Sequence, residues 1–524
     1  MPGRKRSVHG GYYSQWVGAE VMGMAGFLLL LPSLPFAAAS YELVTPPEHP
    51  RRTGLHLSLH DHAAPIQRRR SLLASNDGAT LPLAFLGRSQ GSTAASRVYH
   101  VVDYGADPTG RNDSSDAISR AISDAFQPPK TGRTLLSGIP DLGGAEVHLD
   151  GGTYLVGRPI RLPSSGGGNF KMHGGTLVAD DDFPTDGYLI ELWAASSSSG
   201  GGAAAAGSSG DLHYEYVTVR GLMLDANYRG GGIAIIDSLR TTVDNCYIAH
   251  FATDGVLVRG GHETYVRNSF IGQHITAGAD PGEKNFTGVG INLDGNDNAV
   301  TDVTIFSAAT GVAVSGQANI LSGVHCYNKA TGWGGIGIHL RLPGLTQTRI
   351  VNCYLDYTGI LAEDPVQLLV ANSFFLGDAN VVLKSVKGVM RGVTIVDNLF
   401  SGNDKEVDIV QLDESSGKVF GDVDGVLVNR NVVRGMRERA TVARGSARGN
   451  GTTWAVDFSP VLLFPDRIDY VQYTLRPHGG AAGGLLFQGH ALRNVSSNRV
   501  VVESRSPISA TVHVAVDQSV AAAA

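Results

Sequence analysis

The chain has few cysteines, few aromatic residues and no excess of positive charge. Its 524 residues include only 3 Cys, and so few thiols, odd in number, argue against a disulfide framework. The formal net charge is −6, and no basic stripe carries interleaved aromatics, so we expect no nucleic-acid partner. The sequence also lacks a P-loop, metal-ligand spacing and a nucleophile elbow, so we expect no metal and no cofactor.

A long apolar run occurs near the N-terminus and nowhere else. Val21–Leu31 contains no charged or polar side chain, follows the basic Arg4–Arg6 and precedes the small Ala37–Ala39. This order predicts a cleaved secretory signal over residues 1–39. The alternative is an uncleaved anchor, but the run is short for a membrane span. We therefore expect a secreted protein that starts near Ser40 and has no contact with membranes after cleavage.

Glycine is abundant, at 68 residues, and two short phrases recur. One phrase, such as Asn245-Cys246-Tyr247, returns at 268–270, 325–327, 352–354, 372–374 and 398–400. The second, a glycine followed by alternating apolar residues, starts at Gly232, Gly255, Gly290, Gly311, Gly335 and Gly359. Four steps lead from Gly255 to Gly359, which gives an average period of 26 residues. Strand alternation at such a period predicts an all-β fold, a right-handed parallel β-helix.

Both phrases would form columns along the β-helix. Pairs such as Val256 and Val258, or Ile291 and Leu293, would stack inside the coil as aliphatic columns. The first phrase predicts a buried ladder of amides in which the next coil satisfies each polar group. Its members are Asn245, Asn268, Asn352, Asn372 and Asn398, with His325 as a substitute. The three cysteines would share this buried column, and the alternative is a bridge between Cys326 and Cys353.

The repeats also divide the chain. We expect a flexible or processed leader over 40–96, the β-helix over 97–450 and a small C-terminal β cap over 451–524. Residues 112–126 predict a capping helix with Asp113 as N-cap and an apolar face of Ile118, Ile122 and Ala125. One coil carries an insertion of about ten residues within 272–287. Four sequons fit a secretory route: Asn112, Asn285 (on the insertion, where we expect a glycan), Asn450 and Asn494.

The outward positions of the glycine phrase form a charged face. The position four past each glycine gives Arg259, Asp294, Ser315, His339 and Glu363, and Asn292 and Arg341 lie two positions away on their strands. One coil on, Asn380 replaces the glycine and the same offset gives Lys384. Strands of neighbouring coils lie about 4.8 Å apart, so this face suits an extended polymer of repeated polar units. The alternative is the ordinary polar surface of a secreted β-helix.

Carboxylates on this face could perform acid–base chemistry. Glycoside hydrolysis usually needs one protonated and one ionised carboxyl group, and Asp294 with Asp297 at the next turn supplies a pair. Two close carboxylates raise each other's pKa, so one can hold a proton in mild acid. Asp254, directly before Gly255, is a third candidate.

The N-terminal segments resemble a known module. Residues 101–110 (VVDYGADPTG), 113–122 (DSSDAISRAI) and 143–154 (GGAEVHLDGGTY) resemble the opening of the pectate-lyase superfamily, over roughly residues 97–440. With residues 325–340 (HCYNKATGWGGIGIHL), the chain looks most like the plant QUARTET-type polygalacturonases, divergent relatives of glycoside hydrolase family twenty-eight.

The catalytic motifs of that family match only in part. Ala252-Thr253-Asp254 resembles its Asn-Thr-Asp, with Ala in place of Asn. No Asp-Asp pair stands in the following coil, Gly332-Trp333-Gly334 lies where Gly-His-Gly is expected, and Arg349-Ile350-Val351 half resembles Arg-Ile-Lys.

The resemblance implies a monomeric apoplastic enzyme of the cell wall that hydrolyses the α-1,4-galacturonan of pectin (homogalacturonan) with inversion. Asp294 and Asp297 would be acid and base with Asp254 assisting. Arg259, Asn292, His339, Arg341, Glu363 and Lys384 would hold the substrate. Two alternatives stay open: a pectate lyase, which needs a Ca²⁺ site of clustered carboxylates and in which Arg259 would be the base, and a wall-binding protein whose catalytic motifs have decayed.

Overall fold

The computed structural model describes residues 97–130, 132–193, 212–274, 286–327, 335–342, 347–478 and 489–519. These residues all belong to one compact unit, Ser92–Ala524. The expected signal segment over 1–39, the leader over 40–96, the sequon at Asn285 and the Gly332–Gly334 motif lie outside the described ranges.

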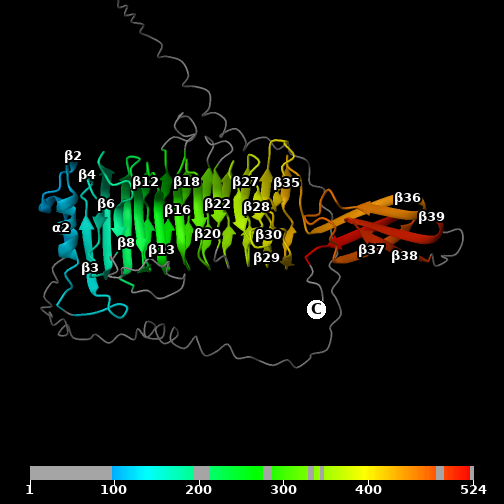
Figure 1. The fold of residues 1–524 in the computed structure, drawn as a ribbon, viewed down its shortest axis with the longest axis horizontal. Helices are drawn as coiled ribbons and strands as arrows, with labels where there is room; N and C mark the ends of the chain where they lie inside the picture. The colour runs from blue at the N-terminus through cyan, green and yellow to red at the C-terminus, as the bar shows by residue number, and fades with distance from the viewer. Residues whose placement is uncertain are drawn as a thin grey trace, which may run out of the picture. The chain divides into compact units, whose positions relative to one another are not determined.

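The described chain is dominated by a parallel β-helix, as the sequence predicts (Figure 1). Its strands form one 33-stranded sheet in which each coil pairs in parallel with the next. The opening elements are β1 (Val98–His100), η2 (Val101–Tyr104), β2 (Thr109–Asp113), α2 (Ser115–Ala125), β3 (Asp141–His148), β4 (Thr153–Val156), β5 (Ile160–Arg161), β6 (Gly167–Ala179), β7 (Tyr188–Leu192) and β8 (Tyr214–Asp225).

Three faces of the β-helix follow. The first comprises β9 (Gly231–Ile236), β13 (Asp254–His262), β16 (Val289–Asn296), β19 (Thr310–Val314), β22 (Ile336–Leu340), β25 (Ile360–Glu363), β28 (Val381–Lys384) and β32 (Val410–Asp413). The second comprises β11 (Thr242–Asp244), β14 (Tyr265–Arg267), β17 (Ala299–Thr301), β20 (Ile320–Ser322), β23 (Arg349–Val351), β26 (Leu369–Ala371), β30 (Thr394–Val396) and β34 (Leu427–Asn429). The short β10 (Ser238–Leu239) pairs with the start of β8 and the end of β13. The third comprises β12 (Tyr247–Ala249), β15 (Phe270–Gly272), β18 (Thr304–Phe306), β21 (His325–Tyr327), β24 (Tyr354–Asp356), β27 (Phe374–Leu376), β31 (Leu399–Ser401) and β35 (Val432–Arg434). A separate pair joins β29 (Val389–Arg391) to β33 (Asp422–Asp424).

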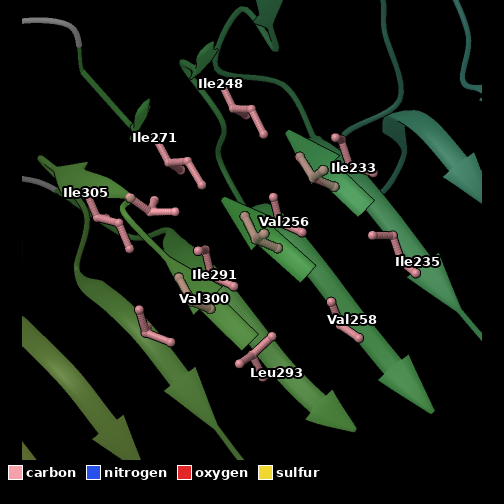
Figure 2. Close-up of a cluster of buried hydrophobic side chains, with 14 of the residues drawn as sticks. Ile233, Ile235, Ile248, Val256, Val258, Ile271, Ile291, Leu293, Val300 and Ile305 are labelled. Carbon is pink, nitrogen blue, oxygen red and sulfur yellow. The ribbon is translucent and has the colours of Figure 1, made fainter. Parts of the chain in front are cut away.

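The interior of the coil is a set of aliphatic columns. Val256 pairs with Ile291, Ile291 with Val312 and Val258 with Leu293, and all five side chains are buried. Figure 2 shows Val256, Val258, Ile291 and Leu293 directed into the coil together with side chains of the other two faces. The expected apolar columns are therefore confirmed, and their burial supplies the main favourable free energy of folding.

The coils differ in length, so the average period of 26 residues hides a change of register. Val256 pairs with Ile291 and Ile291 with Val312, so one coil takes 35 residues and the next 21. The long coil confirms the insertion between β15 and β16. The sequence predicts that Gly335 is the repeated glycine of the next coil, and this prediction is wrong by two residues. Val312 pairs with Ile338, so Gly337 lies beside Gly311. A Cβ on Gly311 would stand 2.5 Å from the Gly337 carbonyl oxygen, so this column brings backbone against backbone.

The predicted buried amide ladder is wrong for most of its members. Asn245, Asn268, Asn352 and Asn372 are exposed, and each has a positive φ of 51 to 56°. They form the turn between the second and third faces. In register with them lie Gly221, Asp302, Gly323, Asp397 and Arg430, and all of these also have a positive φ. We call these nine residues the corner column. Glycine and asparagine enter the left-handed region most readily, which explains the repeated Asn.

The buried polar ladder lies one residue after the corner. Asn398 is 1% exposed and follows Asp397, so its phrase is shifted by one position from the other copies. Its Oδ1 accepts from the Ser373 N–H at 3.0 Å, and its Nδ2 donates to Val370 O and Asn431 Oδ1, each at 3.1 Å. Only the Asn398 copy of the phrase therefore has the predicted role.

The cysteines are buried and free, which contradicts the bridge between Cys326 and Cys353. Cys246 and Cys353 each follow a corner residue, as predicted. Cys326 does not share their column, because it pairs with Leu355 on β24. The phrase at 325–327 is thus two positions out of register with the others. His325 faces outward and is partly buried, and its ring is tilted against that of Tyr354 with 4.2 Å between ring centroids.

The N-terminal end is covered by α2. Ile118, Ile122 and Ala125 are fully buried on one face of this helix, as predicted. The N-cap residue is Ser114 and not Asp113, whose Oδ1 instead accepts from the Ser115 N–H at 3.0 Å. Within the ranges that the structure describes, no helix is long and apolar enough to span a membrane.

The C-terminal part is an antiparallel sheet with a core of its own. β39 (Arg499–Asp517) pairs with β36 (Val442–Asp457), β37 (Tyr470–Pro477) and β38 (His490–Ser496). Antiparallel pairing thus begins at Val442, whereas the sequence placed the boundary at 451. The runs Arg499–Val501 and Thr511–Val516 both belong to the single long strand β39.

Candidate active site

One outward row on the first face carries most of the predicted charged residues. Arg259 pairs with Asp294, and the neighbouring pairs place Ser315 beside Asp294 and Arg341 beside Ser315. The row continues through three further coils as Glu363, Lys384 and Asp413. We call these seven residues the charged row.

His339 is not part of the charged row, which corrects the expectation from the sequence. It pairs with Ala313 and Leu361, in a second outward row two positions earlier along each strand. Asn292 belongs to this second row, since it also pairs with Ala313. The cause is the two-residue error at Gly335, and Arg341 takes the place that was assigned to His339.

Opposite charges follow one another along the charged row. The Nε of Arg259 lies 3.8 Å from Asp294 Oδ2, and the Nζ of Lys384 lies 3.7 Å from Glu363 Oε1. The Arg259 and Asp294 side chains are 59% and 47% exposed, against 31% for Lys384 and 17% for Glu363. The Arg259 end is therefore open to a ligand, and the Glu363 end is held more firmly by the protein.

A hydrogen-bonded chain beside this row joins residues from four different coils. The Tyr188 hydroxyl donates to Asp254 Oδ2 at 2.7 Å, and Asn292 Nδ2 donates to Asp254 Oδ1 at 3.2 Å. Arg341 Nη2 then donates to Asn292 Oδ1 at 2.8 Å. Burial, assisted by the bond to Asp254, raises the pKa of Tyr188, so its hydroxyl keeps its proton and remains a donor. This chain fixes the position of three groups predicted from the sequence.

Tyr188 was missed by the sequence reasoning because its coil precedes the regular repeats. Tyr188 pairs with Gly231, and the pairing of β9 with β13 places Gly231 beside Asp254. A Cβ on Gly231 would lie 2.3 Å from the Tyr188 ring. The glycine therefore lets the ring pass over one coil to reach Asp254. That glycine, directly before Gly232 of the repeated phrase, is the signal that could have revealed the contact.

Glu363 organises the other end of the site. Its Oε1 lies 3.3 Å from His339 Nε2, and its Oε2 accepts from the Leu342 N–H at 3.2 Å. Burial lowers the pKa of His339, although the bond to Glu363 opposes this shift. A neutral imidazole beside Glu363 and Lys384 can donate to or accept from a sugar hydroxyl.

The structure brings two of the three predicted catalytic carboxylates to one end of β16. Asp294 is on the strand, and Asp297 follows it in a turn with a φ of 57° and a side chain that is 51% exposed. Asp297 Oδ2 lies 3.1 Å from His262 Nδ1. Asp254 lies apart from them, because the register partner of Asp294 is Arg259, five positions beyond Asp254, or about 16 Å along the strand.

Other expected groups lie away from this face. Arg349 is on β23, in the second face of the coil. Asn450 and Asn494 are exposed on the C-terminal sheet, and Asn494 Nδ2 donates to the hydroxyl of Ser496 in its own sequon at 3.0 Å. Asn112 is exposed too, but its amide donates to Asp107 Oδ2 at 2.8 Å and the Ser114 of its sequon is buried. Of the three, Asn112 is the least suited to carry a glycan.

Known proteins resemble this chain in sequence and in fold. No family model matches the chain. It is 61% identical over 427 residues to the polygalacturonase QRT3 of Arabidopsis thaliana, covering 81% of this chain and 85% of that protein. Among solved structures, the endo-xylogalacturonan hydrolase of Aspergillus tubingensis superposes with a TM-score of 0.43 at 12% identity, over 65% of this chain and 92% of that one. A tailspike protein mutant of the E. coli bacteriophage HK620 gives a TM-score of 0.43 at 10% identity, over 87% of this chain and all of that one.

Proposed function

Since the chain belongs to the polygalacturonase family, we propose that it hydrolyses homogalacturonan, the α-1,4-linked galacturonan of cell-wall pectin. In this proposal the chain is secreted, acts in the apoplast as a monomer, and uses the first face of the β-helix as its substrate site.

The charged row is the observation that carries this proposal. Three cations, Arg259, Arg341 and Lys384, project from one face at intervals of three coils and two coils. With coils about 4.8 Å apart, they extend over roughly 24 Å, the reach of several sugar units. A polyuronate carries one carboxylate on each sugar, so several of them can meet these cations at once. Local positive charge of this kind attracts an anionic polymer in spite of the net charge of −6.

Asp294 and Asp297 are the proposed acid and base. Both are exposed at the open end of the row, where the bond to be cleaved can reach them. An inverting hydrolase needs its carboxyl groups roughly 6.5–9.5 Å apart, so that a water molecule fits between them. Two residues that are three positions apart across the end of a strand can meet that spacing. Asp254 has a different role. It accepts hydrogen bonds from Tyr188 and Asn292, and it positions Asn292 and Arg341 toward the substrate.

The second function to be tested is β-elimination, because Arg259 lies beside Asp294. An arginine base would have to take a proton from the substrate, whereas the Arg259 guanidinium is already paired with the Asp294 carboxylate at 3.8 Å. Hydrolysis is therefore the better supported reaction.

The test uses the full secreted chain with de-esterified homogalacturonan. We expect new reducing ends without the ultraviolet absorbance of an unsaturated uronide, with or without a chelator. Fully methyl-esterified pectin is the matched control, since it lacks the carboxylates, and it should be degraded far more slowly. Unsaturated product would indicate a lyase. Binding of oligogalacturonate without any cleavage would indicate a protein that only binds the wall.

A further inference from the structure

Three histidines stand in register at the N-terminal end of the β-helix, on strands that the charged row does not use. His100 on β1 pairs with His148 on β3, and His148 pairs with His173 on β6. Their ring centroids lie 5.5 Å and 4.6 Å apart in turn. Polymer binding on the first face gives no reason for such a column.

Asp150 brings two of these rings to one point. It lies in the turn after β3 with a φ of 50°, and its Oδ1 lies 2.7 Å from His100 Nδ1 and 2.6 Å from His148 Nδ1. Possible ligand atoms of the three residues all lie within 4.8 Å of one another. In the described part of the chain, this is the one group of three such residues that is close enough to hold a metal ion.

The backbone beside the group leaves space for the His148 ring. Gly174 has a φ of 80°, and a Cβ on it would lie 2.9 Å from His148 Nε2, so the missing side chain leaves room for the ring. The third histidine is held elsewhere, since His173 Nε2 lies 3.0 Å from Glu146 Oε2. The His100, His148 and Asp150 side chains are 45%, 32% and 25% exposed, so an ion from solvent can reach them.

We propose that His100, His148 and Asp150 form a binding site for a divalent transition metal ion, with zinc the best match. Two imidazoles and one carboxylate are a typical zinc ligand set, and water would complete the tetrahedron. Ligand atoms around a tetrahedral zinc ion lie about 3.3 Å apart, given bonds of about 2.0–2.1 Å. The two Nδ1–Oδ1 distances of 2.6–2.7 Å would therefore have to open by only about 0.6–0.7 Å.

The bound ion would fasten the start of the β-helix. It would join β1, the first strand that the structure describes, to β3 and its turn in the next coil. A ligand that binds only the folded state stabilises that state by mass action, so zinc should raise the midpoint of thermal unfolding. The site lies apart from the charged row, so the effect on stability should not require a change in activity.

The experiment uses the full secreted chain without a histidine tag, freed of metal with a chelator and dialysed. Zinc chloride is titrated by calorimetry into the wild type and into the His148→Gln, Asp150→Asn and His173→Gln variants. Asp150→Asn is well matched, because asparagine tolerates the left-handed turn. His173→Gln is the control, since it changes the same column but removes no proposed ligand. Unfolding midpoints in chelator show whether each variant is folded.

We expect one equivalent of zinc on the wild type and on His173→Gln, and at least tenfold weaker binding on His148→Gln and Asp150→Asn. Cobalt(II) in place of zinc should give the visible absorption bands of a four-coordinate site in the wild type, and the two ligand variants should lose them. The proposal is overturned if the wild type binds no zinc, or if folded ligand variants bind it as tightly as the wild type does.

Discussion

The charged row and the corner column are both outward, polar and repeated once per coil, yet they do different things. In the charged row the backbone is extended and the residue type changes from coil to coil, with Arg259, Asp294 and Glu363 among its members. In the corner column the backbone has a positive φ at every member, and Asn or Gly fills most positions. Repetition of one residue type thus marks a backbone requirement, because few residue types enter the left-handed region. Outward residues on extended strands meet no such backbone requirement, so the alternating charges of the charged row point to a ligand.

The largest expected difference is between an Asp-to-Asn substitution in the charged row and the same substitution in the corner column. Asp294→Asn should reduce hydrolysis of de-esterified homogalacturonan by about 10²–10⁴-fold, because an amide cannot transfer the proton. Asp302→Asn, in the corner column, should leave the rate unchanged, since Asn accepts a φ of 54°. Reducing-end assays and thermal unfolding of both variants make the comparison. Full activity in Asp294→Asn would move the catalytic role to another carboxylate, with Asp254 and Glu363 the next candidates.

The second effect concerns the buried ladder beside the corner. Asn398→Leu should lower the free energy of unfolding by about 1–3 kcal/mol, because Ser373, Val370 and Asn431 each lose a partner. Any activity per folded molecule should be retained. Denaturant unfolding measures the loss, and a variant as stable as the wild type would show that the ladder contributes nothing.

A smaller effect should follow from the corner itself. Asn352→Leu should destabilise the fold by about 1–2 kcal/mol, because a bulky residue is strained at a φ of 56°. The side chain is exposed, so lost buried hydrogen bonds are not the cause. Asn352→Gly should be close to neutral in the same unfolding experiment, since glycine adopts this conformation freely. Equal damage from Gly and Leu would mean that the Asn side chain matters more than the backbone.

The smallest expected effect is a pH dependence of the free energy of unfolding, caused by His325 near the corner column. Burial lowers the pKa of His325 to about 4, from 6.5. The unfolded chain therefore binds a proton that the folded chain does not between these values, and stability should fall as the pH drops from 6.5 towards 4. Allowing for the partial exposure of the ring, the loss is about 1 kcal/mol. His325→Phe keeps an aromatic ring against Tyr354 and should remove this part of the pH dependence, which urea unfolding at several pH values would detect.

Much of the fold could be predicted from the sequence, because side-chain alternation and repeated turns are local signals. The aliphatic columns, the face of α2, the insertion before β16 and the terminal β sheet all follow from such patterns. The errors lie where register between coils decides. A phrase match cannot tell whether Asn352 or Cys353 turns inward, because the inward direction depends on one left-handed residue.

The sequence predicted which face of the β-helix carries the candidate site, but not how the site residues lie relative to one another. Asp294, Arg259 and Glu363 were placed correctly from their distance to a glycine, and Lys384 from the same distance to Asn380, which replaces the glycine in its coil. His339 and Arg341 were interchanged because one coil contains two glycines that are two residues apart, Gly335 and Gly337, and only backbone packing selects between them. The contact between Tyr188 and Asp254 spans two coils, so spacing within the repeats could not indicate it.

By itself, the sequence determined the architecture, the inward columns and the polar face, since each depends on periodicity along one strand and on burial of apolar surface. Only the tertiary structure decided which residues share a row, which carboxylates meet and which histidines converge on Asp150. Those neighbours lie on different coils of unequal length. Their alignment is fixed by backbone hydrogen bonds between coils and by close packing at glycine, and a single strand's sequence records neither.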